Sequence, residues 1–418
     1  MRKFAAPTLL ALTATAAVMG VQGAPAQGLT TTVRTPTHYA MAGLGFGTAG
    51  SGGLAPAADD ATAFQAIGCT NRAGIVKGNH VETTTVPGLG NLENVTTKLW
   101  TTHSGDVVAS HSRHSIERLT LASSGMGSLE INAIRSTVRA FHNATGYHGS
   151  TATHVGSLVY TPTAGPAQQI PVPTPGHPAT VPGLATIAIG DATKTVGNAG
   201  AHVTANALDI RVTASGSRFR VAHTGAKIDG GVTKGTFAGS SSGSHGNAAD
   251  GNASLGRQPL LLMPCQGTRG EVRTKSTTRS DLGNNVVANN IATRELGAQL
   301  ATAAKGYERA SIASVDIGGQ DVVVRGIVGQ ANVTRSHGDV VRNAAGTTIG
   351  EVTVNGETRK FPDTGVLEIP GVARLERHIV HRTPNGIQVT ALRVTLLDGS
   401  GAVLDFGQAR LRIRGSGL

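Results

Sequence analysis

The chain has few aromatic residues, few cysteines and few charges for its length. Aromatic side chains make up 3% of its 418 residues, with a single Trp, and charged residues make up 15%. A core with so few rings must consist of Val, Ile, Leu and Ala, and few platforms remain for stacking sugars or bases. Two cysteines exclude a disulfide-stapled miniprotein. After the N-terminal segment no apolar run is long enough to cross a bilayer, so we expect no transmembrane segment in the mature chain.

The positive charge is spread along the chain rather than concentrated. The formal net charge is +11, without a basic tail or a block of Lys and Arg. Proteins that bind nucleic acid usually cluster their charge and interleave aromatic residues, so we expect no nucleic-acid partner. A basic surface of this kind favours loose contact with anionic polymers of a cell envelope.

The N-terminus has the pattern of a secretory signal peptide. Arg2 and Lys3 precede an uncharged stretch over residues 4–21, and Ala24-Pro25-Ala26 fits a cleavage site between small residues. We predict a signal peptide over 1–26 and an N-terminal extension over 27–36. A membrane anchor is the alternative. Export would place the two cysteines where disulfides can form.

The remaining chain reads as two copies of one unit. Both cysteines stand in similar stretches, "GCTNRAG" and "PCQGTRG", and further matches follow in the same order. They include "STVRAF" (136–141) with "VVVRGI" (322–327) and "NALDIRVTA" (206–214) with "TALRVTLLD" (390–398). A repeat of roughly 190 residues exceeds any solenoid period and indicates tandem domains. We predict a first domain over 37–230 and a second over 231–418.

The local patterns predict strands almost throughout. Asn355-Gly356 and Asn385-Gly386 lie between alternating apolar residues, which is typical of hairpin turns. The Thr, Val and Gly content also suits strands and tight turns. One stretch differs, because Ala292, Leu296, Leu300 and Ala303 have helical spacing and predict a helix, although its counterpart in the first copy predicts strands. The Gly/Ser-rich stretch 237–256 is typical of a flexible segment.

Both copies contain further distinctive motifs, which include "VPGLGNLENVTTK", "VPGLATIAIGDATKT", "LMPCQGTRG" and "LEIPGVARLE". With these motifs the chain resembles the choice-of-anchor P family of secreted and cell-surface proteins from high-GC Gram-positive bacteria. The resemblance implies an exported protein with no established chemistry. The chain departs from it at "LRIRGSGL", which has neither an apolar tail nor a sorting motif. We therefore expect free secretion or non-covalent retention at the cell surface.

The two cysteines are the first candidate site. Cys69 and Cys265 occupy matching places in the two copies, so they would face each other if the copies pack about a two-fold axis. We predict a disulfide between them. Two reduced buried cysteines, or an intermolecular disulfide, are the alternatives.

No motif points to a cofactor or a reaction. "GFGTAG" (45–50) matches a dinucleotide pattern, but a loop rather than a helix follows it, so we expect these glycines to permit close packing. His111 and His114, like His378 and His381, are three residues apart, and on a strand such pairs point to opposite faces and cannot share a metal. We expect no cofactor and predict no catalytic, cofactor-binding or metal-binding residues.

The last strand carries the other candidate site. Arg410, Arg412 and Arg414 alternate with apolar residues, so the three arginines should share one face of a strand. They could contact an anionic envelope polymer. The alternative is a charged sheet edge that prevents aggregation.

These patterns predict an all-β protein of two tandem, homologous β-sandwich-like domains, with solenoid-like packing as the alternative fold. We expect an exported bacterial cell-envelope or extracellular protein with a structural or interaction role and no catalytic activity. The alternatives are a carbohydrate-active enzyme with paired carboxylates in a cleft, and a secreted metal-binding protein that uses clustered histidines. The oligomeric state is left open.

Overall fold

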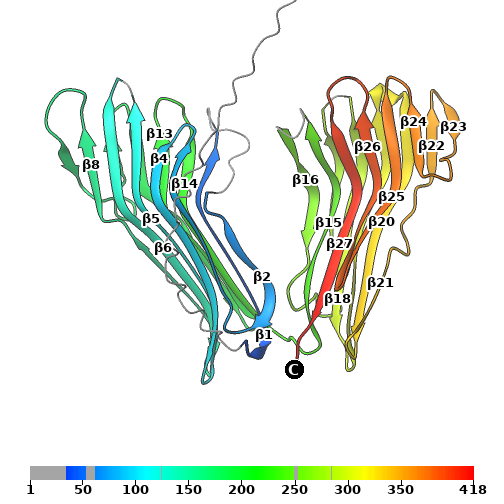
Figure 1. Ribbon diagram of the computed structural model, residues 1–418, viewed down its shortest axis with the longest axis horizontal. Helices are drawn as coiled ribbons and strands as arrows, with labels where there is room; N and C mark the ends of the chain where they lie inside the picture. Colours follow the sequence, from blue (N-terminus) through cyan, green and yellow to red (C-terminus); the bar gives the residue numbers. More distant parts are fainter. Residues whose placement is uncertain (1–33, 53–61, 124, 249–252, 284) are drawn as a thin grey trace, which may run out of the picture. The chain divides into compact units, whose positions relative to one another are not determined.

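A computed structural model describes residues 34–52, 62–123, 125–248, 253–283 and 285–418 (Figure 1). Residues Arg34–Leu418 form one compact unit. The predicted signal peptide and residues 27–33 of the predicted extension lie outside the described residues. No helix within the described ranges is long and apolar enough to cross a membrane.

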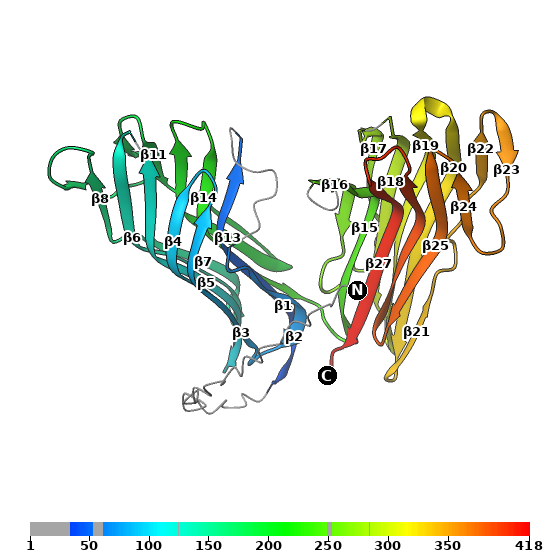
Figure 2. The same cartoon turned by 45° about the horizontal axis from the view of Figure 1, so that its top comes forward.

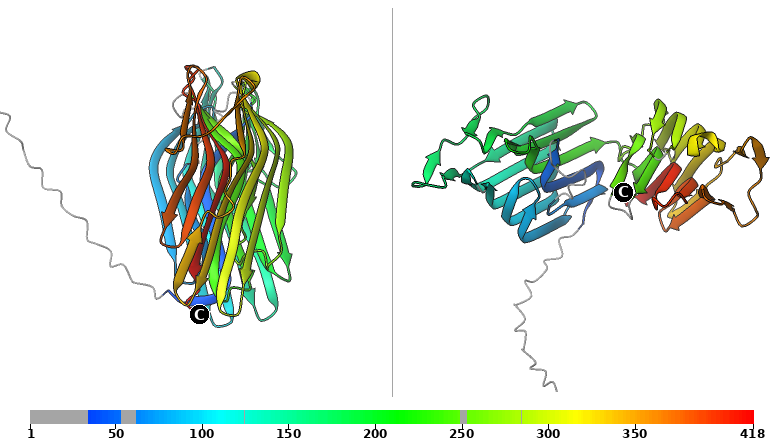
Figure 3. Two further views of the ribbon diagram at one scale, coloured as in Figure 1. Left: turned by 90° about the vertical axis from the view of Figure 1, so that its right-hand side faces the viewer. Right: turned by 90° about the horizontal axis from the view of Figure 1, so that it is seen from above.

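The protein is all-β, as its composition predicted. The strands form four separate sheets in which every pairing is antiparallel, and together they make two sandwich-like halves. Seen end-on, the strands of each half fall into two layers (Figure 3). The alternative of solenoid-like packing is wrong, because these sheets are built from neighbouring antiparallel strands rather than from stacked coils.

The first half contains strands β1 to β14. One sheet has the order β10-β11-β13-β14-β1-β2, with β12 also paired to β13, and the other has the order β3-β4-β5-β6-β8-β9, with β7 also paired to β6. The bounds are β1 Pro36–Ser51, β2 Gln65–Arg72, β3 Val76–Val86, β4 Gly90–Ser104, β5 Val107–Ser123, β6 Gly127–Asn143, β7 Gly146–His154, β8 Ser157–Thr161, β9 Gln168–Ile170, β10 Ala179–Val181, β11 Ala185–Ile189, β12 Ala192–Gly197, β13 Gly200–Val212 and β14 Arg218–Gly230.

The second half contains β15 to β27. Its sheets have the orders β16-β15-β27-β26-β25-β24 and β17-β18-β19-β20-β22-β23, with β21 also paired to β20. A short 3-10 turn, η2 (Gly318–Gln320), lies between β19 and β20. The bounds are β15 Gly235–Ala248, β16 Ala253–Leu262, β17 Arg273–Asp281, β18 Val287–Gln299, β19 Ala303–Ile317, β20 Val322–Ser336, β21 Asp339–Asn343, β22 Glu351–Val354, β23 Glu357–Arg359, β24 Val366–Ile369, β25 Ala373–Thr383, β26 Gly386–Leu396 and β27 Val403–Gly415.

The two halves share one strand order and the same irregularities. In each half the first and last strands pair with each other, as β1 pairs with β14 and β15 with β27. Residues with positive φ interrupt the pairing at corresponding points, with Asn94 in β4 matching Asn290 in β18 and Ala133 in β6 matching Gly326 in β20. Motifs that are similar in sequence therefore occupy similar places in the fold.

The predicted hairpins are present, and two local predictions are wrong. Asn355-Gly356 joins β22 to β23, with φ of 51° and 82°, and Asn385-Gly386 joins β25 to β26. The predicted helix is instead the end of β18 and the start of β19. Residues 249–252 of the predicted flexible Gly/Ser stretch lie outside the described residues, and its described part contains most of β15, a strand held between β16 and β27. Its small residues suit this place, because Ser241 and Ser244 are fully buried.

Each half encloses two apolar clusters separated by polar residues. In the first half, one cluster contains Leu92 and Val221 and the other contains Met41 and Val203. In the second half, one cluster contains Ile312 and Phe406 and the other contains Phe237 and Ile413. The buried polar residues of the first half include Thr97, Ser112 and His114, and those of the second include Thr293, Glu295 and Glu308.

The predicted disulfide between Cys69 and Cys265 is present. The two Cα atoms are 5.2 Å apart and the residues are separated by 196 positions, so the bond joins β2 to the segment after β16. Both cysteines pack with Ala40, Ala42 and Val232 in a small cluster. Cys265 is 4% exposed, so this sulfur serves as a buried crosslink rather than as an accessible thiol.

Candidate functional site

Arg410, Arg412 and Arg414 lie on one face of β27, as their alternation predicted. Leu411 and Ile413 between them are fully buried and belong to the core. The arginine side chains therefore point to the outer face of the sheet. The alternative of a charged sheet edge is wrong, because β27 is paired along its length with β15 on one side and β26 on the other (Figure 1).

The pairing register extends this row of arginines across neighbouring strands. Arg410 lies opposite Gln388 of β26 and Ser240 of β15, and Gln388 lies opposite His381 of β25. Arg412 lies opposite Gly386, and the lack of a side chain at Gly386 leaves room for the aliphatic part of the arginine. A β-carbon added to Gly386 would be 2.9 Å from the β-carbon of Arg412.

An open hollow borders these side chains. It has a volume of about 330 Å³ and is lined by all three arginines, by His381 and Gln388, and by the β25–β26 turn. A smaller hollow beside it is lined by Arg410, Gln388 and Arg257 of β16. We name Arg257, Arg410, Arg412 and Arg414 the arginine face. Sequence reasoning missed Arg257, because nothing in the sequence shows that β16 lies in this sheet.

The charges of the arginine face are not balanced by carboxylates. None of its four members takes part in an ion pair recorded among the described residues. The acidic residue on the same strand, Asp405, instead binds Arg393 at 2.7 Å and Gln408 at 3.0 Å. Burial lowers the pKa of Arg412, and Arg414 and Arg410 lower it further, while its Nε has no hydrogen-bond partner in the described structure. The arrangement suits an anion that would enter from outside.

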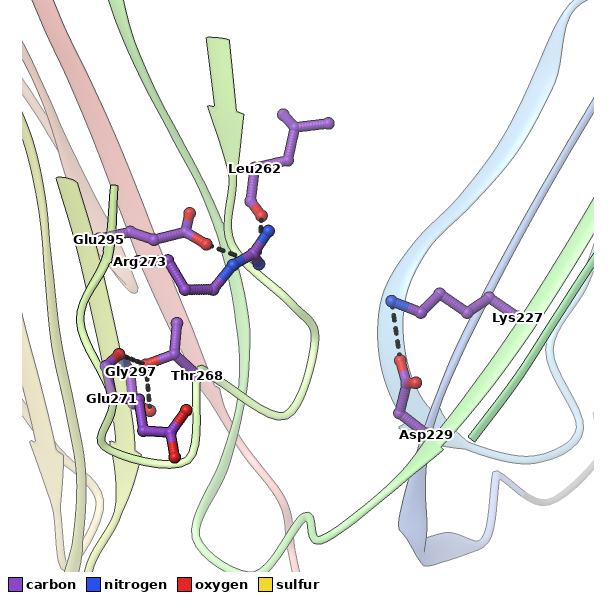
Figure 4. A network of polar contacts seen from close by, with 8 residues as sticks. All are labelled: Lys227, Asp229, Leu262, Thr268, Glu271, Arg273, Glu295 and Gly297. Carbon is purple, nitrogen blue, oxygen red and sulfur yellow. Dashed lines mark hydrogen bonds and ion pairs between the residues drawn. The ribbon is translucent and has the colours of Figure 1, made fainter. Parts of the chain in front are cut away.

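A second unusual group lies inside the second half. Glu295 and Glu308 stand directly opposite each other on β18 and β19, and both are fully buried. Arg273 of β17 reaches Glu295 at 2.8 Å (Figure 4). Burial raises the pKa of Glu295 to about 7, although Arg273 opposes this effect. Burial also raises the pKa of Glu308 well above its ordinary value, and the charge of Glu295 adds to the rise.

This carboxylate pair does not make a glycosidase site. Opposed residues on adjacent strands have β-carbons about 4.5–5.5 Å apart, close enough for retaining chemistry. Both side chains are 0% exposed, however, so no substrate reaches them. Sequence reasoning missed the pair because it assigned a helix to the stretch that contains Glu295. A strand assignment would have placed Glu295 on the same face as Ile291 and Thr293.

The histidines are dispersed, as residues three apart on strands should be. His114 is fully buried and its Nδ1 lies 2.7 Å from Oγ1 of Thr97, whereas His111 stacks on Trp100 on the other face of the same sheet. Within the described ranges no group of three or more His, Cys, Asp or Glu residues could hold a metal ion. Metal binding by clustered histidines therefore has no structural support.

The glycines of "GFGTAG" serve close packing, as expected. They lie within β1 rather than between a strand and a helix. A β-carbon at Gly45 would be 2.8 Å from Cγ2 of Thr97 in the facing sheet. This closeness lets Ser112 donate a hydrogen bond of 2.8 Å to the carbonyl of Leu44, which ties the two sheets together.

A comparison with protein-family models gives no match, and neither does a comparison with curated protein sequences. The chemistry of the candidate sites must therefore be argued from the residues themselves.

Proposed function

We propose that this protein is an exported, non-enzymatic binding module of a bacterial cell envelope, and that its arginine face holds an anionic envelope polymer. The observation that carries the proposal is a row of three arginines in the middle of a sheet, none of which forms an ion pair with a carboxylate of the described residues. Like charges gathered in this way repel one another, and a polyanion would relieve that repulsion. The signal-peptide pattern and the resemblance to choice-of-anchor P proteins support export and a cell-surface location.

The geometry suits a polymer better than a small ion. Successive outward residues of one strand are about 6.5–7 Å apart, so the Cα atoms of Arg410 and Arg414 are separated by roughly two such steps. The three arginines present their hydrogen-bond donors along this length of the strand. The adjacent hollow of about 330 Å³ is open and bears polar side chains such as Gln388 and His381. An extended chain carrying regularly spaced phosphates or carboxylates could contact all three guanidinium groups. Each of them can bind such a group with two parallel hydrogen bonds.

The test uses the triple variant R410Q/R412Q/R414Q and immobilised poly(glycerol phosphate). We expect the apparent Kd to rise at least tenfold relative to the unchanged protein, and binding of the unchanged protein to weaken steeply between low and physiological salt.

The matched control is R325Q/R359Q/R374Q, which removes the same charge from arginines that already pair with Glu351, Glu357 and Glu376. It should bind nearly as well as the unchanged protein. Equal loss in both triple variants would mean that only net charge matters, and would refute a specific arginine face.

A further inference from the structure

The only tryptophan of the chain lies on the outer face of the first half. Strands β4, β5 and β6 are neighbours in one sheet (Figure 2). Trp100 of β4 is opposite His111 of β5, which is opposite Arg139 of β6. The Trp100 and His111 rings are parallel within 6° with centroids 4.7 Å apart. The Arg139 guanidinium lies 4.1 Å from the centroid of Phe141, whose ring also stacks on His148. A continuous row of rings and cations therefore crosses four strands.

Three further cations share this face with Arg139. Lys98 of β4 lies opposite Arg113 of β5, one step along from Trp100, and Arg135 lies farther along β6. All three are exposed. We name Lys98, Trp100, Arg113, Arg135 and Arg139 the tryptophan face.

The outward residues beside the five members of the tryptophan face are mostly neutral or basic: Thr96, Thr102, Ala109, His111, Ser115, Thr137, Phe141, His148, Ser150, Ala152 and His154. One carboxylate lies at the border of the face: Glu117 is exposed at the next outward position of β5 after Ser115, and it accepts a hydrogen bond from Asn94. None of the four cations takes part in an ion pair recorded within the described ranges. Nε of Arg139 is buried and has no hydrogen-bond partner there. The charge of the face is complementary to an anion.

The rings of this face are not open stacking platforms. His111 covers one face of the Trp100 ring, and the Lys98 ammonium lies 5.9 Å from its centroid. Phe141 is in contact with both Arg139 and His148. Proteins that bind single-stranded nucleic acid stack bases on exposed aromatic faces. The hydroxyl of Thr137 lies between Arg135 and Arg139 on β6, and that of Ser150 lies opposite Arg139 on β7. Such hydroxyl groups suit a ligand rich in hydroxyl groups.

We propose that the tryptophan face binds an acidic polysaccharide, with Lys98, Arg113, Arg135 and Arg139 contacting its anionic groups and the interspersed Ser and Thr hydroxyls contacting its sugar hydroxyls. The spread of the cations over three strands fits a chain of sugar rings rather than a single small anion. This site lies in the first half and does not depend on the arginine face. It adds a second ligand class to the function proposed above.

Trp100 provides a local readout, because it is the only tryptophan. The experiment titrates the full exported chain with polygalacturonate and follows tryptophan emission. We expect a saturable change in intensity that weakens with salt, and no change with neutral dextran of similar length. The triple variant K98Q/R113Q/R139Q should bind polygalacturonate at least tenfold more weakly while keeping its β-sheet circular dichroism and its melting temperature within a few degrees.

Two comparisons make the proposal refutable. R410Q/R412Q/R414Q should show the same tryptophan response as the unchanged protein, so failure at one face is distinguishable from failure at the other. No emission change with polygalacturonate, or an equal change with dextran, would overturn the proposal. Tighter binding of oligo(dT) of equal charge would also overturn it, in favour of a nucleic acid.

Discussion

Ala133 and Gly326 occupy corresponding places in β6 and β20, and both have positive φ, 54° and 66°. The left-handed conformation costs a residue with a side chain roughly 1–2 kcal/mol, and glycine almost nothing. Both positions are exposed, so little apolar burial changes with the side chain. We expect Ala133→Gly to raise the free energy of unfolding by about 0.5–1 kcal/mol and Gly326→Ala to lower it by about 1 kcal/mol. Denaturant titration measures both.

A glycine also gives the unfolded chain more conformational freedom, which lowers the free energy of unfolding and so opposes the gain expected at Ala133. Measuring both substitutions controls for this general effect of glycine. Ala152 of β7 offers a matched site, since it lies in the same sheet and is not among the residues with positive φ. Ala152→Gly should destabilise the protein. A loss of stability in Ala133→Gly of the same size would contradict the strain argument.

The row of Arg273, Glu295 and Glu308 across β17, β18 and β19 should make the second half less stable as pH rises. The folded pKa of both carboxyls is raised, to about 7 for Glu295. A carboxyl with a raised folded pKa contributes stability below its unfolded value, about 4.5, and loses it as pH rises through the folded value. From the pKa of Glu295 we expect a loss on the order of 2–3 kcal/mol between pH 5 and pH 8, measured by hydrogen exchange in these strands. Glu295→Gln should remove this contribution.

The first half provides an internal control of opposite sign. Burial lowers the pKa of His114 to about 3, so the stability linked to this histidine is present above about 6.5 and falls as pH decreases. Glu351→Gln, at an exposed ion pair, should leave both trends unchanged. If the protection factors of strands β17 to β19 are equal at pH 5 and pH 8, the carboxyls are not held protonated by burial.

The strand patterns show which parts of the fold and the sites the sequence could predict. The Asn-Gly turns and the alternation around Leu411 and Ile413 each depend on a few neighbouring residues, and both predictions are confirmed. The helix prediction failed because Ala and Gly suit several spacings, and Leu300, which fitted the helical period, is 47% exposed between two strands. The buried carboxyl pair and Arg257 depend on which strands become neighbours, and local pattern does not determine that.

At the scale of the whole molecule, a cluster of a few small residues forms the apolar contact between the halves in the part of the chain that the structure describes. The cluster around the disulfide holds Ala40, Val232 and Cys265 with Ala42 and Cys69, whereas each half has two larger clusters of its own. Asn71 adds a hydrogen bond of 2.8 Å to the carbonyl of Ser416. Small apolar contacts contribute little stability, so the covalent bond should be the main constraint between the halves.

Removal of the disulfide should therefore affect stability without preventing either half from folding. The loop closed by the bond spans 196 positions, for which chain entropy gives up to about 5 kcal/mol. We expect C69S/C265S to lower the denaturant midpoint and the free energy of unfolding by a few kcal/mol, up to that value. It should keep the β-sheet circular dichroism, because Leu92 and Phe406 remain in separate intact cores.

Mass spectrometry of the unchanged protein decides whether the bond exists in solution. Alkylation after denaturation should find no free thiol, and peptide mapping without reduction should recover one peptide linking Cys69 to Cys265. The double variant should show hydrogen exchange that increases most around Ala40 and Val232 and little within the four large clusters. Two alkylated cysteines in the unchanged protein would mean that the halves are not covalently linked, and an unchanged midpoint in C69S/C265S would mean that the bond does not restrain the unfolded chain. Either result would mean that only weak contacts, such as the hydrogen bond of Asn71 to Ser416, restrain the two halves relative to each other. Such contacts could not hold the two binding faces in a fixed arrangement.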